Sequence, residues 1–447
     1  MSNYKLQNSK GFLRWQNFRV FLKKIHSFGT ITNSCVIMTI NYNNSQNIIN
    51  LLTYLSNESR KDDIDLLVIE NSTSVLEKKK LIDYIKDNKI SNITILETIE
   101  NLGSAGAYAL GLEYIFSNNS FEKVFIYEDD VLLLEKNTFS EMLNLSNNNN
   151  LVYINGPINT GCGKSWLVQI GLYGVDFLKK VGVPNPTYFT RSEDLDLKER
   201  FELIIKKYGY KEVVINKNYF HPYLKKYNGQ VWWIYFSIRN HLYTNFKWLK
   251  IGSITYFINL FLYFWYGLSK LFIEKNGLIL KSFFYAVIDY ILGNYTFENN
   301  KKKLNFFKKI SIDYPGNAID SEYSLTQLNN ITKNIYLISN SLLAKSDRQK
   351  IKFSTKLNSF FKNGCLIGGY FSPIYPIFML SKCIISINEY DYINNKYLIS
   401  TISNKPKYIE VFFSFLIALL LFITILFPLI FLRGIIVYLS NKLSNYG

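Results

Sequence analysis

Short apolar runs alternate with amphipathic stretches between residues 31 and 130, and this alternation limits the possible folds more than any other feature of the chain. The runs have the β-branched and aromatic composition of buried strands, and the stretches between them repeat apolar residues at helical spacing. Strands that alternate with helices form a largely parallel sheet covered by helices, so the sequence predicts an α/β domain. The expected strands are 35–40, 64–71, 92–96 and 123–130, and the expected helices are 45–59, 75–88 and 103–116.

Polar residues follow each of these strands, in the segments TINYNN, IENST, ENLGSAG and EDD. In parallel sheets the ligand lies at the carboxyl ends of the strands. We therefore expect the four segments to converge on one crevice.

Three adjacent carboxylates, Glu128, Asp129 and Asp130, lie between two apolar runs at the end of the fourth strand. Such carboxylates repel one another and resist desolvation. A bound cation relieves both effects, and a solvated turn does so as well. In a strand, Glu128 and Asp130 share one face, while Asp129 points the other way.

Composition narrows the classes of partner. The chain has 447 residues, enough for two or three domains, and a net charge of +17. That charge favours an anionic partner: nucleic acid, acidic lipid or a phosphorylated substrate. It is spread along the chain without a nucleic-acid-binding motif, so we expect no nucleic-acid partner. The four cysteines form no CxxC pair, which indicates neither a zinc site nor a disulfide framework.

Two uncharged segments point to a membrane. Residues 411–432 carry no charge over 22 positions, which is long enough for a transmembrane helix. A buried core helix is the alternative, and Pro428 also permits a re-entrant segment. Residues 251–269 are rich in Tyr, Phe and Trp, which favours a helix lying on the membrane interface, with a span as the alternative. The basic run 299–309 either attracts anionic lipid or forms a solvated linker.

A family resemblance rests on seven segments that occur in order. ENLGSAGAYALGL and FIYEDDVLL resemble family 2 glycosyltransferases of the GT-A fold. More narrowly, they resemble the galactofuranosyl- and rhamnosyl-transferases of bacterial surface polysaccharide synthesis. The other five segments are VIMTINYNN, IENST, YFTRSEDLDLKERF, FHPY and VWWIYFSIRN. The resemblance covers about residues 31–300 and implies a GT-A domain, a Rossmann-like fold of nucleotide-diphospho-sugar transferases.

The resemblance implies that Mn²⁺ or Mg²⁺ is bound by Glu128, Asp130 and His221. A hard cation held by carboxylate oxygens neutralises the diphosphate that leaves during sugar transfer. The chain departs from the family by having Glu in place of Asp at residue 128 and again at residue 70.

Donor or acceptor contacts are also implied by the resemblance. Gly103 and Gly106 would let backbone amides at a helix start approach an anion, although small residues also serve tight packing. Trp166 stacks on the acceptor sugar or packs in the core. Arg239 pairs with diphosphate or an acid, or it locks the aromatic segment onto the domain. The complete expected set is Thr39, Glu70, Asn71, Asn101, Gly103, Gly106, Asp129, Trp166 and Arg239.

Asp194 is the catalytic base that the resemblance implies, with Glu193 beside it. An inverting transfer needs a carboxylate that accepts the acceptor hydroxyl's proton, and neighbouring carboxylates raise each other's pKa. The same segment also predicts a helix start that Ser192 caps. Arg200 either pairs with these acids or faces water.

These expectations describe an inverting, metal-dependent glycosyltransferase, a hexosyl- or pentosyl-transferase of capsule or cell-wall polysaccharide synthesis. It would move a sugar, galactofuranose or rhamnose favoured, from a nucleotide-sugar donor to a lipid-linked glycan. Sugar nucleotides are cytosolic, which places the catalytic domain on the cytoplasmic side of the inner (plasma) membrane. Alternatives are a UDP-hexopyranose donor or a catalytically degenerate, membrane-anchored scaffold. Further expected partners are anionic lipid, a second copy of the chain and other polysaccharide-synthesis enzymes.

A basic amphipathic helix is expected at 12–28, and strands are possible at 334–339 and 383–387. The sequence thus predicts five parts. The parts are an N-terminal basic amphipathic segment (1–30), the GT-A catalytic domain (31–245), membrane-interface helices with the basic run (246–309), an unassigned C-terminal region (310–405) and a transmembrane helix (411–432).

Overall fold

The main sheet of the computed structural model has the strand order β1-β4-β3-β2-β5-β8-β7-β9. Four of its strands run parallel and are the four that the sequence predicts: β4 (Ile93–Thr98), β3 (Ile64–Glu70), β2 (Cys35–Asn41) and β5 (Lys123–Tyr127). The chain passes from β2 through β3 to β4 on one side and then places β5 on the other side of β2. The strand order therefore reverses between β2 and β5, which is where α/β sheets bind ligands.

The structure describes residues 21–30, 33–118, 120–129, 131–133, 135–146, 151–155, 170–214, 219–220, 231–248, 254–274, 277–311, 321–324, 336–337, 365–368, 383–391, 396–403 and 408–444. The chain divides into two compact units, the first of residues 1–222 with 442–447 and the second of residues 223–441. The predicted end of the catalytic domain at residue 245 lies inside unit 2, and that boundary stays a prediction.

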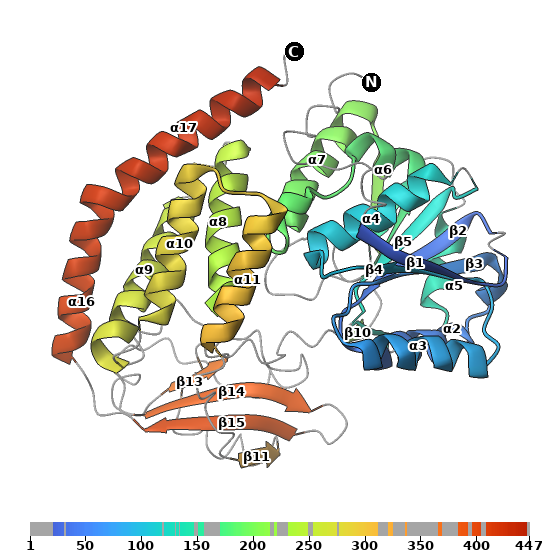
Figure 1. Cartoon of the computed structure of the whole chain (residues 1–447), viewed down its shortest axis with the longest axis horizontal. Coiled ribbons are helices and arrows are strands. Elements are labelled where there is room, and N and C mark those ends of the chain that lie inside the picture. The colour runs from blue at the N-terminus through green and yellow to red at the C-terminus, as the bar shows by residue number, and fades with distance from the viewer. Residues whose placement is uncertain are drawn as a thin grey trace. The chain divides into compact units, whose positions relative to one another are not determined.

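Helices cover both faces of the sheet (Figure 1). On one face α2 (Ser45–Leu55), α3 (Val75–Asp87) and α5 (Thr138–Leu145) share a core with Ile37, Val68 and Phe125. On the other face lies α4 (Gly103–Ser117), in which Gly111 permits a close approach. A Cβ at Gly111 would lie 2.5 Å from Sδ of Met38. The sequence predicts α2, α3 and α4, and the structure confirms them.

The rest of unit 1 extends the sheet beyond β5. β8 (Ile170–Gly174) pairs antiparallel with β5, β7 (Leu151–Asn155) pairs antiparallel with β8, and β9 (Lys211–Val214) runs parallel to β7. α6 (Val175–Val181) and α7 (Glu193–Tyr208) meet through Phe177 and Phe201, whose stacked rings lie 5.1 Å apart. A separate two-stranded sheet joins β6 (Leu132–Leu133) and β10 (Tyr219–Phe220).

The helix predicted at 12–28 is wrong over its second half. β1 (Leu22–Phe28) is a strand that pairs antiparallel with β4 at the edge of the sheet. Leu22 and Ile25 suit a helical face, but β4 offers an open edge whose backbone groups need partners. His26 adds a 3.1 Å contact to Glu97 of β4. Residues 12–20 lie outside the described part of the chain.

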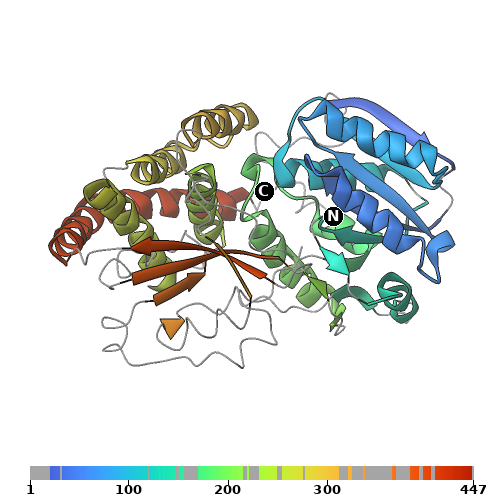
Figure 2. The same cartoon turned by 90° about the horizontal axis from the view of Figure 1, so that it is seen from below.

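Unit 2 contains a group of helices and a second sheet. The helices are α8 (Val231–Lys247), α9 (Ile254–Glu274), α10 (Leu278–Leu292), α11 (Phe297–Ser311), α16 (Tyr408–Leu421), a π-helical turn (Phe422–Leu426) and α17 (Phe427–Ser444). The sheet has the order β11 (Ser321–Ser324), β15 (Lys396–Ser403), β14 (Cys383–Asp391), β13 (Cys365–Gly368) and β12 (Tyr336–Leu337). Figure 2 shows its longer strands side by side. The expected strands at 334–339 and 383–387 correspond to β12 and β14.

The helix Ile409–Ser440 is long and apolar enough to cross a membrane, and it is the one such helix among the residues listed above. It contains the predicted span 411–432 and continues past Pro428 without a break. The aromatic segment 251–269 is also helical from residue 254, as α9. Its residues Phe264, Trp265 and Tyr266 are buried within unit 2, where α9 packs against α10 and α16.

Candidate functional site

The carboxyl ends of β2 and β3 are joined by buried side chains. Nδ2 of Asn41 donates to Glu70 at 2.6 Å, and the backbone N–H of Ser72 donates to the other carboxylate oxygen of Glu70 at 2.9 Å. Burial raises the pKa of Glu70, and these hydrogen bonds oppose the increase. Oδ1 of Asn41 and Oγ1 of Thr39 have no hydrogen-bond partner and are buried. Two orphaned polar atoms therefore lie at the point where the strand order reverses.

The loops that follow β2 and β3 hold each other in place. Oδ1 of Asn43 accepts hydrogen bonds from the backbone N–H groups of Thr73 and Ser74, both at 2.9 Å. Glu77, in the first turn of α3, accepts from the N–H of Ser45 at the start of α2 at 2.8 Å. These contacts hold the two loops together at the carboxyl ends of β2 and β3, where they can position functional side chains.

Asn71 and Asn101 connect the end of β3 to the start of α4. Oδ1 of Asn71 accepts from the N–H of Leu102 at 2.8 Å, and its Nδ2 donates to Asn101 at 3.0 Å. Asn101 in turn accepts from the N–H of Gly103 at 2.8 Å. Two amides at this helix start are thus already engaged by side chains. The predicted donor contacts of Asn71, Asn101 and Gly103 stay predictions beside this structural role.

Gly103 brings the segment before α7 against α4. Its φ is +70°, and a Cβ there would lie 2.1 Å from the carbonyl oxygen of Phe189. That same carbonyl accepts from the N–H of Ala105 at 3.1 Å. Gly106 is also closely packed, because its Cβ would lie 2.9 Å from Cβ of Leu102. Close packing, the alternative for both glycines, is therefore observed.

Phe189 is the centre of a strained turn. Its φ of 64° and ψ of −59° are those of a γ-turn, closed by the N–H of Thr190 donating to the Tyr188 carbonyl at 2.8 Å. Arg191 and Ser192 also have positive φ values, 70° and 66°. Residues held in such conformations cluster at functional sites.

Glu193 is held against α4 at the first turn of α7. Oγ of Ser104 donates to Oε1 of Glu193 and lies 3.2 Å from Oγ1 of Thr190. Oε2 of Glu193 is buried without a hydrogen-bond partner. Burial, and after it the charge of Asp194, raise the pKa of Glu193 to about 7. A carboxyl with this pKa exchanges protons readily near neutral pH.

The helix predicted after Ser192 is confirmed, but Ser192 makes no side-chain cap. Its left-handed backbone turns the side chain inward, where Oγ is buried without a partner. Arg200 pairs with one acid of this first turn, Asp196, at 3.2 Å, and both side chains are buried. Its Nη1 also donates to the carbonyls of Val181 and Val183, at 3.0 Å each.

The acidic segment after β5 forms a turn. β5 ends at Tyr127, and the N–H of Val131 donates to the carbonyl of Glu128 at 3.1 Å. The Tyr127 hydroxyl donates a second hydrogen bond across the turn, to the Val131 carbonyl. The strand geometry expected for Glu128 and Asp129 is therefore wrong, because a turn replaces the alternation of faces. Both are half-buried.

Two of the three predicted metal ligands, Asp130 and His221, lie outside the described residues. Trp166, predicted for the acceptor site, lies outside them as well. No group of three or more His, Cys, Asp or Glu side chains suited to a metal occurs in the remainder. Phe220 of β10 pairs with Leu132 of β6, so the chain that leads to residue 221 passes beside the acidic turn.

Arg239 belongs to unit 2 and is fully buried there. Nη2 donates to Oδ1 of Asn240 at 2.7 Å, and Nη1 donates to the Tyr235 hydroxyl at 3.1 Å and to Asn300. These partners join α8 to α11 within unit 2, and the locking of the aromatic segment onto the catalytic domain stays a prediction. The contact of Arg239 with a donor stays a prediction as well.

Sequence reasoning missed Ser104, Thr190 and the turn at Phe189. Ser104 stands in a run of small residues that indicates only close packing. A γ-turn at a phenylalanine has no sequence signal, because its conformation is imposed by the contact with Gly103 and Ala105.

Comparison with known proteins gives structural similarities only. No family model matches the sequence, and no curated protein matches it. Among solved structures, the mannosyltransferase PcManGT from Pyrobaculum calidifontis, in complex with GDP-Man and Mn²⁺, is similar at a TM-score of 0.38 and 12% identity, over 66% of this chain and 79% of that one. S. aureus TarS is similar at a TM-score of 0.37 and 12% identity, over 65% of this chain and 56% of that one. S. aureus TarS 1–349 is similar at a TM-score of 0.35 and 13% identity, over 63% of this chain and 91% of that one. Similarities at this level do not assign the chain to a family.

Proposed function

We propose that this chain is an inverting glycosyltransferase that takes a sugar from a nucleotide donor and transfers it to a lipid-linked glycan. The observation that carries the proposal is the contact between the acidic start of α7 and the start of α4, at the carboxyl edge of the sheet. It joins Glu193 and Ser104, 89 positions apart in sequence, next to the loops that follow β3 and β4. The ordered resemblance of seven sequence segments supports the same reading.

The donor's nucleotide would lie at the carboxyl ends of β2 and β3. Thr39 and Asn41 offer buried atoms without partners, and the carboxylate of Glu70 lies beside them. Polar atoms buried without partners are rare in proteins, and a ligand would satisfy them. We propose galactofuranose or rhamnose as the sugar, with a UDP-hexopyranose donor as the alternative.

Mn²⁺ or Mg²⁺ would be held by Glu128, Asp130 and His221, and it would supply charge neutralisation for the departing diphosphate. Two observations suit this: Glu128 lies in a tight acidic turn, and β10 brings the chain beside that turn immediately before residue 221.

Asp194 would accept the proton of the acceptor hydroxyl during its attack on the anomeric carbon. Glu193 would hold the first turn of α7 in place and so position Asp194. Its carboxyl is anchored by Ser104, while Asp194 stays half-exposed on the same turn. The reaction would take place at the cytoplasmic face of the inner membrane, in the synthesis of capsule or cell-wall polysaccharide, with Ile409–Ser440 as the anchor.

A degenerate scaffold is the second candidate. It is favoured by the amides at the start of α4, which are already bound to Asn71 and Asn101. Calorimetric titration of the detergent-solubilised chain with a panel of sugar nucleotides, with Mn²⁺ and with chelator, separates the two. Metal-dependent binding of one donor supports the transferase. Absence of binding to every donor in both conditions supports the scaffold.

The roles of the acidic residues are tested on the donor identified in this way. Asp194→Asn should abolish transfer and leave donor affinity within about twofold, since the base touches the acceptor and not the donor. Asp130→Ala should weaken donor binding only when metal is present. Near-normal turnover of Asp194→Asn would show that another residue is the base.

A further inference from the structure

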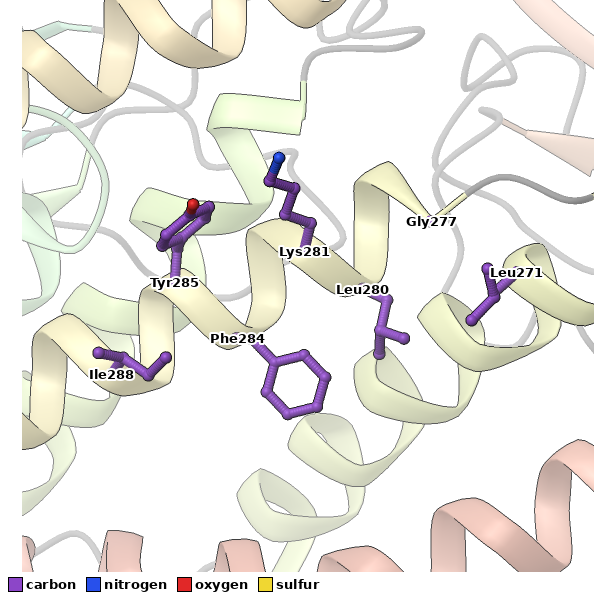
Figure 3. A pocket seen from close by; sticks show the side chains of 7 residues that line it. All are labelled: Leu271, Gly277, Leu280, Lys281, Phe284, Tyr285 and Ile288. Atoms are coloured by element: carbon purple, nitrogen blue, oxygen red, sulfur yellow. The ribbon is translucent and has the colours of Figure 1, made fainter.

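A groove of about 440 Å³ lies along α10, beside the end of α9 (Figure 3). It is lined by Leu271, Gly277, Leu280, Lys281, Phe284, Tyr285 and Ile288. Its volume falls within the range of small-molecule sites, about 300–1,000 Å³. All of the lining residues belong to unit 2.

The groove itself is almost entirely apolar, and Lys281 and Tyr285 stand at its rim. Lys281 and Tyr285 stand one turn apart on α10 and point the same way in Figure 3, while Leu280 and Phe284 point away from them. An occupant that suits both the apolar groove and this rim must itself be amphipathic, with a long apolar part and a polar end.

The charge at the rim of the groove is positive. Nζ of Lys281 lies 4.9 Å from the ring centre of Phe306, and no ion pair joins it to a carboxylate anywhere in the described ranges. Lys303 lies 3.8 Å over the Tyr285 ring and pairs with Asp289 at 3.3 Å. Lys302 is exposed on the same helix, α11. The polar end of the occupant is therefore expected to be an anion.

The groove lies at a defined level of the candidate span. Nε1 of Trp265 on α9 donates to Ser414 of α16 at 3.1 Å. Two residues further along α9, Leu280 approaches this helix closely, because a Cβ at Gly267 would lie 3.0 Å from the Cα of Leu280. Leu280 is thus level with Ser414, about 9 Å from the start of α16 at 1.5 Å per residue. Lys281 then lies near the membrane boundary, where lipid phosphates are found.

We propose that this groove binds one anionic phospholipid of the bilayer. Its phosphate would lie between Nζ of Lys281 and the hydroxyl of Tyr285, and one acyl chain would lie along Leu280, Phe284 and Ile288. Basic pockets between membrane helices bind such headgroups in this way. The proposal rests on the membrane attachment proposed above but not on sugar transfer.

The test is native mass spectrometry of the full chain released from detergent, titrated with phosphatidylglycerol or with phosphatidylcholine of the same acyl chains. One phosphatidylglycerol should be retained more tightly than phosphatidylcholine. Lys281→Gln should weaken phosphatidylglycerol binding about fivefold, the usual effect of one lysine near a lipid surface. Lys79→Gln, at an exposed lysine of unit 1, is the matched control and should change nothing.

Leu271→Trp keeps the charge and fills the groove, so it should weaken phosphatidylglycerol binding as well. Equal retention of both lipids, or retention that Leu271→Trp does not alter, would overturn the proposal. Tighter binding of a polyprenyl phosphate than of phosphatidylglycerol would overturn the assignment to a bilayer lipid. Sedimentation with phosphatidylglycerol vesicles separates failure of the groove from failure of the membrane attachment. If the full chain does not sediment with the vesicles, the membrane attachment itself is overturned.

Discussion

At the scale of single residues, Glu193 makes the folding stability of unit 1 depend on pH. Its pKa is raised from 4.5 to about 7 by burial, so the folded chain binds its proton more tightly than the unfolded chain. The stabilisation is complete below pH 4.5 and is lost as the pH rises to about 7. The difference is on the order of 3 kcal/mol by the relation between pKa and free energy.

We therefore expect the thermal-unfolding midpoint of unit 1 to fall between pH 5 and pH 8 and to fall less in Glu193→Gln. Asp194→Asn should move the pH dependence to lower pH, because the charge of Asp194 is the second cause of the raised pKa. An equally steep fall in Glu193→Gln would show that another group is responsible.

Gly103 has a second, purely steric consequence at this scale. Gly103→Ala should destabilise the fold by more than the cost of a left-handed alanine, which is about 1–2 kcal/mol, since its Cβ would lie 2.1 Å from the Phe189 carbonyl oxygen. Gly209→Ala is the matched control, with a φ of +66° and open space around its Cβ. Denaturant unfolding of both variants measures the difference, and equal losses would mean that the segment at Phe189 yields without cost.

At the scale of elements, Arg239 joins α8 to α11 through Asn300, and Tyr235 joins α8 to α10 through Asp289 at 2.7 Å. Arg239→Lys should lower stability by about 1.5–3 kcal/mol, because an ammonium cannot reach all the partners of the planar guanidinium. Arg60→Lys, at a half-exposed surface ion pair, should change stability by less than about 1 kcal/mol. A loss of donor affinity with unchanged unfolding would instead place Arg239 at the donor.

Elements were predictable where a local pattern decides their structure. β2 to β5 and α2 to α4 follow from apolar periodicity and from the polar residues at their ends. The strand β1 could not be predicted in this way, because Leu22 and Ile25 suit a helix as well. Only pairing with the open edge of β4 selects the strand. In the candidate site, the family resemblance of their segment singles out the acids at 193 and 194, and their catalytic role stays a prediction. Their anchor at Ser104 was not predictable, because it arises from a tertiary contact over 89 positions.

At the scale of the whole molecule, the exposed apolar surface of Ile409–Ser440 requires an explanation. Leu420 and Ile423 keep 64% and 58% of their surface accessible, and Phe412 and Leu432 are similarly exposed. The helix packs its other side against α9, through Ser414. A core helix would be covered on all sides, whereas a helix facing lipid would show this one-sided burial.

We therefore expect the full chain to resist extraction from membranes at alkaline pH. Replacing Leu420 and Ile423 together by Arg should release it, because each charge costs about 2.5–3.5 kcal/mol near the centre of a membrane helix. The double Ala variant is the control and should stay in the membrane fraction. Both side chains point away from the packed side, so neither change removes an interior contact. Retention of the Arg variant after alkaline extraction would place this helix outside the bilayer, and its exposed face would then have to be covered by another protein surface.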